Sequence, residues 1–233
     1  MKMSMKIFFV ILIFGRLDLC ENYVESSYAD GDGNYIKIKT DNGTIDLTCE
    51  KDEKNEKIFD LLPEVFNKTN FVDDCEFRIF DCPFPTHFSA IARHLPKLKI
   101  VFIETEIDEI TSEAFDEILS ASSLNLRNSD VKKLDERAFA NFRELKSLNI
   151  DGSKLESLPE NVFDSNSKLT NFEMNHNAAD LKLKGKIFAN KSRLQKIVFI
   201  NCNVKQLSDD IFMNSKNIRN INFRDNKLEV ISM

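Results

Sequence analysis

The sequence predicts an α/β fold built as a solenoid, in which short repeats stack and each contributes one strand to a parallel β-sheet. Three observations predict this class. Apolar residues recur in one frame about every 24 residues, five phenylalanines recur at the same interval, and most repeats carry a small polar residue at a fixed place. One such unit cannot bury its apolar face alone, so neighbouring copies must stack.

The composition is that of an ordinary soluble domain. The chain has 233 residues, of which 42% are apolar and 30% charged. It contains 20 Phe and no Trp, with only 6 Gly and 5 Pro. Collagen-like, low-complexity and disordered classes are therefore excluded, because enough apolar surface is available to build a core.

The first element in order is a signal peptide, predicted at residues 1–20. Lys2 and Lys6 precede an unbroken apolar run at 7–14. That run is too short for a bilayer, which needs about 20 apolar residues, but it suits a secretory signal. Cleavage after Gly15 and cleavage after Cys20 are both open. We expect a secreted, extracellular protein with no membrane span.

Charge and motifs limit the partners of the mature chain. Loss of residues 1–20 removes three basic groups and one acid and leaves 29 Lys+Arg against 37 Asp+Glu, a net charge of −8. That balance argues against nucleic acid or an anionic membrane as the main partner. Three sequons, at Asn42, Asn67 and Asn190, agree with secretion and predict glycosylation.

Residues 21–74 are expected to form an N-terminal cap. Residues 35–39 and 44–49 alternate in polarity around a turn and predict a hairpin. Residues 61–66 resemble 158–163, which suggests a degenerate first repeat. Cys49 and Cys75 are the favoured disulfide pair, and Cys49 with Cys82 remains the alternative. No two cysteines have the CxxC spacing, so a metal or redox site has no support.

Residues 75–233 contain about seven repeats, of which the last is truncated. The template runs Leu145-xx-Leu148-x-Ile150-xx-Ser153 and ends at Phe163. Equivalent strand positions are spaced 24, 23, 24, 24, 25 and 24 residues apart. They are predicted to point into the core: Phe77, Val101, Leu124, Leu148, Phe172, Ile197 and Ile221.

Two further columns of residues have structural explanations. A single phenylalanine ends each of five repeats, and these rings are predicted to stack as a spine on the convex side: Phe115, Phe139, Phe163, Phe188 and Phe212. The small polar residues after each strand are expected to point inward and bind backbone groups that would otherwise be unpaired: Cys82, Ser129, Ser153, Asn177, Cys202 and Asn226.

This frame resembles the typical extracellular leucine-rich repeat, LxxLxLxxNxLxxLxxxxFxx. It is similar to the repeats of Toll-like receptor ectodomains and of secreted insect leucine-rich immune proteins. The resemblance implies a right-handed horseshoe with a concave parallel sheet and an irregular or short-helical convex side. It also implies a role in innate immune recognition.

Binding is expected on the concave face, where outward side chains of successive strands form columns. Phe80, Ile100 and Phe102 are predicted to form one apolar patch, and Val198 with Ile200 a second. The alternative is that the cap or loops cover Phe80 and Phe102. Between the patches lies a polar centre that could bind a protein or a glycan; it includes Arg127, Asn149, Asp151 and Asn175. Arg224, in the last repeat, is also predicted to contact the ligand.

The sequence carries no catalytic constellation. His87, His94 and His176 form no HExxH pair, and no glycine-rich phosphate loop is present. We therefore expect a non-enzymatic protein without cofactor or metal.

Three functions remain open. The leading interpretation is a secreted binding module for a protein or glycan ligand, in innate immunity by resemblance. The second is a structural or adhesive extracellular matrix protein that dimerises through its uncapped C-terminal edge. The third is a fragment of a Toll-like receptor ectodomain.

Overall fold

The computed structural model describes residues 24–29, 35–41, 44–50, 76–80, 99–116 and 118–229. The predicted signal peptide and the last four residues lie outside these ranges. So does the whole stretch 51–74 of the predicted cap, which includes the proposed degenerate repeat.

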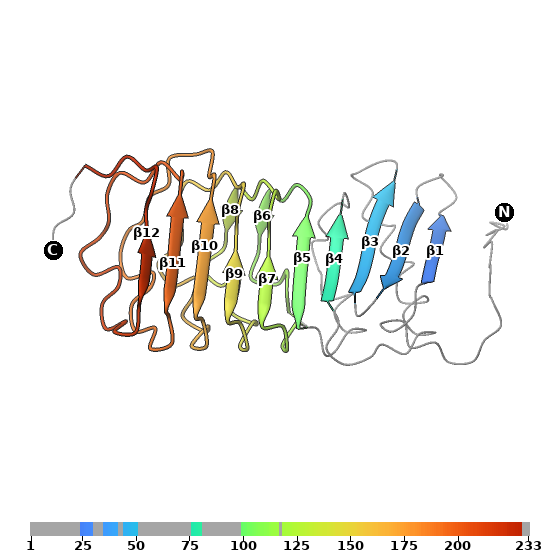
Figure 1. Ribbon diagram of the computed structural model, residues 1–233, viewed down its shortest axis with the longest axis horizontal. Helices are drawn as coiled ribbons and strands as arrows, with labels where there is room; N and C mark the ends of the chain where they lie inside the picture. The colour runs from blue at the N-terminus through green and yellow to red at the C-terminus, as the bar shows by residue number, and fades with distance from the viewer. Residues whose placement is uncertain are drawn as a thin grey trace.

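The described residues form a parallel β-solenoid with one long sheet along one side (Figure 1). In this part of the chain the sheet has ten strands, in the order β1-β2-β3-β4-β5-β7-β9-β10-β11-β12. From β5 to β12 the chain completes about five turns. The strands of the long sheet are β1 (Val24–Ala29), β2 (Tyr35–Asp41), β3 (Thr44–Glu50), β4 (Glu76–Phe80), β5 (Ile100–Glu104), β7 (Ser123–Asn125), β9 (Ser147–Asn149), β10 (Asn171–Asn175), β11 (Lys196–Ile200) and β12 (Asn220–Asn222).

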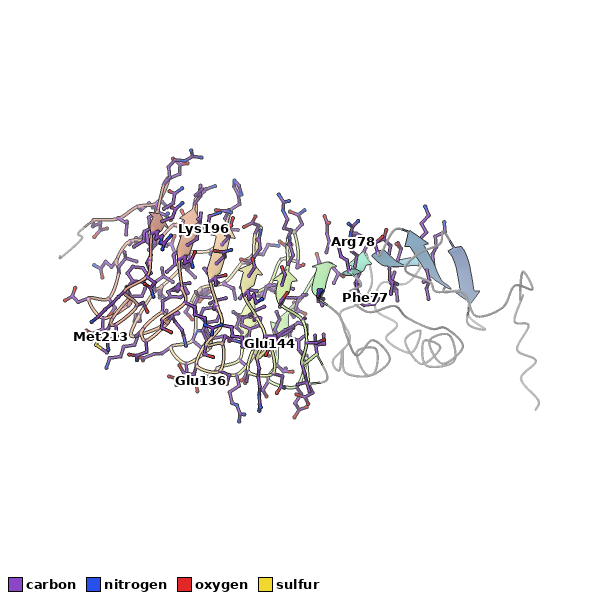
Figure 2. The ribbon with its side chains drawn as sticks, turned by 60° about the horizontal axis from the view of Figure 1, so that its bottom comes forward. Phe77, Arg78, Glu136, Glu144, Lys196 and Met213 are labelled. Carbon is purple, nitrogen blue, oxygen red and sulfur yellow. The ribbon has the colours of Figure 1, made fainter. Side chains whose placement is uncertain are left out.

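The register of the sheet confirms the predicted repeat frame. The seven predicted inward positions are direct partners in an unbroken series, which runs Phe77–Val101–Leu124–Leu148–Phe172–Ile197–Ile221. The first six of these side chains are fully buried. Figure 2 shows the alternation at β4, where Phe77 and Arg78 point to opposite sides of the strand.

An antiparallel unit precedes the parallel strands. β2 and β3 pair as the predicted hairpin, with Asp41 opposite Thr44, and β1 pairs antiparallel with β2. β3 then pairs parallel with β4, and Ile45 lies opposite Phe77. Ile45 and Leu47 are fully buried, so the hairpin continues the inward pattern of the repeats by one more strand.

Phenylalanine rings fill the interior in two rows. In the predicted spine, the ring centroids of Phe139 and Phe163 are 5.9 Å apart, those of Phe163 and Phe188 5.4 Å, and those of Phe188 and Phe212 6.1 Å, all nearly parallel. Phe115 contacts Phe142 edge-on at 4.9 Å. A second row runs along the strands, where Phe172, Phe199 and Phe223 follow one another at 5.2 Å.

The described members of the inward polar column bind backbone as predicted, whereas Cys82 lies outside the described residues. The Asn177 amide accepts the N–H of Leu155 at 2.8 Å and donates to the carbonyl of Leu155 at 2.8 Å. Asn226 donates to the Phe199 carbonyl at 2.6 Å and accepts from the N–H of Cys202 at 3.0 Å. Each of these side chains therefore links one coil to the next and leaves the buried backbone satisfied.

A second polar column, three residues after the spine, was not predicted from the sequence. The Asn166 amide donates to the Phe139 carbonyl at 2.9 Å, the Lys191 ammonium to the Phe163 carbonyl at 2.6 Å, and the Ser215 hydroxyl to the Phe188 carbonyl at 2.6 Å. Because Asn, Lys and Ser differ in size and charge, their common role as buried donors was not evident from the sequence.

The side opposite the long sheet consists of turns. Among the described residues there is no helix; the segments that end each coil are chains of i→i+3 hydrogen bonds, such as Ala138 N–H to Asp135 and Phe142 N–H to Phe139. Of the two predicted forms, irregular or short-helical, the described part shows the irregular one. β6 (Glu109–Ile110) and β8 (Lys133–Leu134) form a short parallel pair behind the long sheet (Figure 1).

Candidate functional site

The candidate site lies on the sheet face, which we define as the side chains of the long sheet that point away from the core. Strand register places these side chains in rows across neighbouring repeats. One row contains Asn125, Asn149, Glu173, Val198 and Asn222. The next row toward the carboxyl ends of the strands contains Arg127, Asp151, Asn175, Ile200 and Arg224.

A groove of about 570 Å³ opens at these carboxyl ends. It crosses the repeats of β7, β9, β10, β11 and β12, and each repeat contributes two consecutive residues. The groove residues are Arg127, Asn128, Asp151, Gly152, Asn175, His176, Ile200, Asn201, Arg224 and Asp225. Five of them are among the ten predicted ligand-binding residues: Arg127, Asp151, Asn175, Ile200 and Arg224.

The other five groove residues form a row with left-handed backbone. Their φ angles are 54° for Asn128, 70° for Gly152, 56° for His176, 55° for Asn201 and 60° for Asp225. Gly adopts this conformation freely, and Asn, Asp and His adopt it more readily than other residues. Sequence reasoning missed this row, although its restricted residue types at the repeat interval were a usable signal.

An aspartate and an asparagine hold the middle of the groove. One oxygen of Asp151 accepts both the backbone N–H and the side-chain amide of Asn175, each at 2.9 Å. The Asn175 oxygen in turn accepts the N–H of Ile200 at 3.3 Å. The network ties three neighbouring repeats together and fixes the groove before any ligand arrives.

Three asparagines of the adjoining row are fixed by their own backbone. The side-chain oxygens of Asn125, Asn149 and Asn222 accept the N–H two residues later, at 3.1, 2.9 and 2.9 Å. In the described part of the chain, their amide nitrogens have no hydrogen-bond partner. They are donors available to a ligand, held in one orientation.

Charged side chains stand at both ends of the groove. Arg127 and Arg224 have 64% and 70% of their side chains exposed, whereas Asp151 has 14%. The Arg127 Nε atom lies 3.9 Å from Asp151, and the Arg224 Nε atom donates to Asp225 at 3.0 Å. Both guanidinium groups therefore keep their terminal nitrogens available to solvent or ligand.

Val198 departs from its predicted exposure. It is only 5% exposed, so Val198 and Ile200 do not form the expected exposed apolar pair. Its neighbours across the sheet are Glu173 and Asn222, and Lys196 holds Glu173 at 2.6 Å. These polar side chains flank the smaller valine on both sides, and only the half-buried Ile200 reaches the groove.

The other predicted ligand-binding residues lie away from the groove or remain undescribed. Asn149 is in the neighbouring row, and Phe80 is half-buried on β4, which is separated from the groove strands by β5. The side chains of Ile100 and Phe102 are outside the described residues. The apolar patch predicted around them therefore stays a prediction.

The predicted modification sites are described only in part. Asn190 is exposed, has a φ of 57° and accepts a hydrogen bond from Asn214 at 3.0 Å on the turn side. Asn42, Asn67 and Cys75 are outside the described residues, as is the side chain of Cys49. The predicted disulfide and the first two sequons remain predictions.

Reactive groups in the described ranges are few. Cys202 is a free, buried cysteine, and burial raises the pKa of its thiol to about 11, which makes it inert. No group of three or more His, Cys, Asp or Glu residues in these ranges could hold a metal ion. The part of the chain that is described also has no helix able to cross a membrane.

The repeat family follows from comparison with known proteins. The model of the BspA type leucine rich repeat region matches six copies over residues 92–219. The chain belongs to this leucine rich repeat family, whose repeat domains are a type of protein-binding module and are typically non-catalytic. The matched type is BspA, whereas the sequence frame resembled the typical extracellular type.

Similar solved structures come from Drosophila. The glycosylated form of the Toll–Spatzle complex, a molecular hub in development and innate immunity, gives a TM-score of 0.50 at 13% identity; the match covers 90% of this chain and 43% of that one. Another structure of the complex gives 0.48 at 13% identity, covering 87% and 41%. The chain thus spans less than half of the chain it matches. No curated protein matches the chain significantly.

Proposed function

We propose that the protein is a secreted leucine-rich repeat module that binds an extracellular protein through the groove on its sheet face. The observation that carries the proposal is the groove itself, which is open, spans five repeats and is held in shape by Asp151 and Asn175. Preorganised polar side chains beside a half-buried apolar residue, Ile200, suit the recognition of another protein.

Secretion and the finer shape belong to this proposal. Residues 1–20 have the pattern of a signal peptide, and a glycan on the exposed Asn190 would lie on the turn side and leave the groove open. The right-handed horseshoe, with the groove on its concave side, is the form that the repeat frame implies. A role in innate immune recognition is suggested by likeness to the repeats of the Toll–Spatzle complex, a likeness that covers the fold alone.

Site-specific photocrosslinking tests the proposed face. Benzoylphenylalanine replaces Ile200 in the groove, and in a matched variant it replaces the exposed Lys184 on the turn side. Both variants are incubated in extracellular fluid of the source. A crosslinked protein at position 200 that is absent at position 184 is expected. The same crosslink at both positions, or one at 184 alone, would contradict the proposal.

An adhesive role through self-association is the second candidate. At β12 the inward residue Ile221 is 51% exposed, whereas the equivalent residues of the preceding strands are fully buried. Light scattering separates the candidates. A dimer that the substitution Ile221→Asn converts to a monomer supports self-association through the exposed side of the β12 repeat. A monomeric native chain contradicts self-association.

A further inference from the structure

The charge of the chain is divided unevenly along its length. Residues 1–117 contain 13 Lys+Arg and 24 Asp+Glu, a net charge of −11. Residues 118–229, which form the groove and the repeats around it, contain 19 Lys+Arg and 14 Asp+Glu, a net charge of +5. The acidic balance of the whole chain therefore does not describe the surface on which the groove lies.

The acidic groups in and beside the groove make more hydrogen bonds and ion pairs within the protein than the basic groups of the groove do. Asp151 is nearly buried and gives one oxygen to two bonds from Asn175, and Glu173 in the adjoining row is paired with Lys196. Asp225 is the one exposed acid of the groove, and it accepts a hydrogen bond from the Nε atom of Arg224. The terminal guanidinium nitrogens of Arg127 and Arg224 have no hydrogen-bond partner among the described residues.

Basic residues also lie at the amino ends of the strands, opposite the groove. They belong to a row of residues that are linked by backbone hydrogen bonds. Lys99, Ser122, Lys146, Thr170, Gln195 and Arg219 precede successive strands, and each N–H from Ser122 onward bonds the carbonyl of the residue before it in this row. Lys99, Lys146 and Arg219 are exposed, and the row has no acid. An acidic partner lying on the sheet face would thus meet cations at both the amino and the carboxyl ends of the strands.

We propose that the groove recognises an acidic protein segment, with Arg127 and Arg224 as its two anchoring groups. The inference rests on the proposed function and names the chemistry of the partner. Guanidinium groups bind carboxylates through paired, charge-assisted hydrogen bonds. The fixed amides of Asn125, Asn149 and Asn222 supply further donors for carboxylate or backbone oxygens.

The spacing of the two arginines favours an acidic protein segment over an acidic polysaccharide. Four strand steps separate Arg127 from Arg224, which is about 19 Å at the usual distance between strands. Between them the row holds Asp151, Asn175 and Ile200, so no cation lies in the middle. A polyuronate carries a carboxylate on every unit and would place some of them against Asp151. An extended protein segment spans about 19 Å with six residues and can carry acids at its two ends alone.

Titration with defined peptides, followed by NMR of the labelled full chain, tests this inference. The probe is a ten-residue peptide of Ser and Thr with Glu at positions 2 and 8, and its control has Gln at both positions. We expect saturable shifts at Arg127 and Arg224 with the Glu peptide and an affinity at least about fivefold lower for the Gln peptide. Equal affinities would overturn the proposal.

Matched variants show whether the effect belongs to the groove. Arg127→Gln with Arg224→Gln removes the two anchors, and Arg137→Gln with Arg193→Gln removes two exposed arginines outside the strands. The first pair should lower affinity for the Glu peptide about fivefold or more, and the second less than twofold. An equal loss in both pairs indicates non-specific attraction and contradicts the proposal.

The outcomes separate this inference from the proposed function. If oligogalacturonate binds the groove more tightly than the Glu peptide, the anion is a glycan and the inference is wrong. If the Glu peptide does not bind while position 200 still crosslinks a protein, the module binds a partner of other chemistry. If crosslinks form on the turn side, the proposed function itself fails.

Discussion

At the scale of single residues, buried polar side chains hold neighbouring coils at a fixed distance. Asn177 is 1% exposed and connects to Leu155, Ala179 and Ser153 through its two polar atoms. The inward orientation of this column was predictable, because a small polar residue recurs in an otherwise apolar frame. Lys191 in the second column was not predictable, since its long side chain suggested a solvated surface.

The buried Lys191 predicts a pH dependence of stability. The side chain is 6% exposed, and burial lowers the pKa of its ammonium group below 10.5. Between the folded pKa and 10.5 the unfolded chain binds more protons, so stability rises with pH in that window. The cost of burying the charge is fully present below the folded pKa and is relieved as the pH approaches 10.5.

Comparison with Lys191→Met isolates this effect. Urea unfolding of both proteins at pH 7 and pH 10 should show the native protein gaining stability relative to the variant at the higher pH. The pKa values of Lys132 and Lys205 are raised by hydrogen bonds to Asp108 and Asp180, but these pairs are common to both proteins and cancel in the difference. A difference that stays constant or changes in the opposite direction would refute the argument.

At the scale of elements, each coil has a strand on one side and a spine phenylalanine on the other. The strand keeps its register through inward residues that alternate with outward ones, and the ring fills the wide part of the coil. Both features follow from the spacing in the sequence. One ring contact does not follow from that spacing: Phe115 packs on Phe142, which lies three residues after the spine residue Phe139.

The spine should contribute unequally along its length. Phe163 is fully buried and contacts the rings of Phe139, Phe172 and Phe188, whereas Phe212 is only partly buried. Phe163→Ala should cost about 3–5 kcal/mol of unfolding free energy, as large-to-small core substitutions do. Phe212→Ala should cost about half as much or less. Chemical denaturation measures both, and equal losses would contradict this account of the spine.

At the scale of the whole molecule, stability accumulates from contacts between neighbouring coils. A solenoid has no long-range core, so a coil in the middle has two neighbours and a terminal coil has one. The described strands show this difference, because Phe172 on β10 is fully buried while Ile221 on β12 is half exposed.

Hydrogen exchange should therefore vary along the sheet. Backbone amides of β9 and β10 should exchange at least about tenfold more slowly than those of β12, because the end coil opens locally at a lower free energy. Mass spectrometry of peptides from the intact protein measures these rates. Uniform exchange from β9 to β12 would indicate a single cooperative unit or a covered end, and would contradict the nearest-neighbour view.

The sequence by itself determined the repeat length, the inward frame and the rows on the sheet face, because side-chain direction in a strand depends only on position along the chain. It placed Arg127, Asp151, Asn175, Ile200 and Arg224 in one row, and the structure brings them into one groove. The tertiary structure alone decided which outward residues are accessible. Val198 is buried between its register partners Glu173 and Asn222, Asp151 is bonded to Asn175, and the terminal nitrogens of the arginines have no partner among the described residues. Exposure and charge pairing depend on neighbours about 24 residues distant, and no local pattern specifies how their side chains meet.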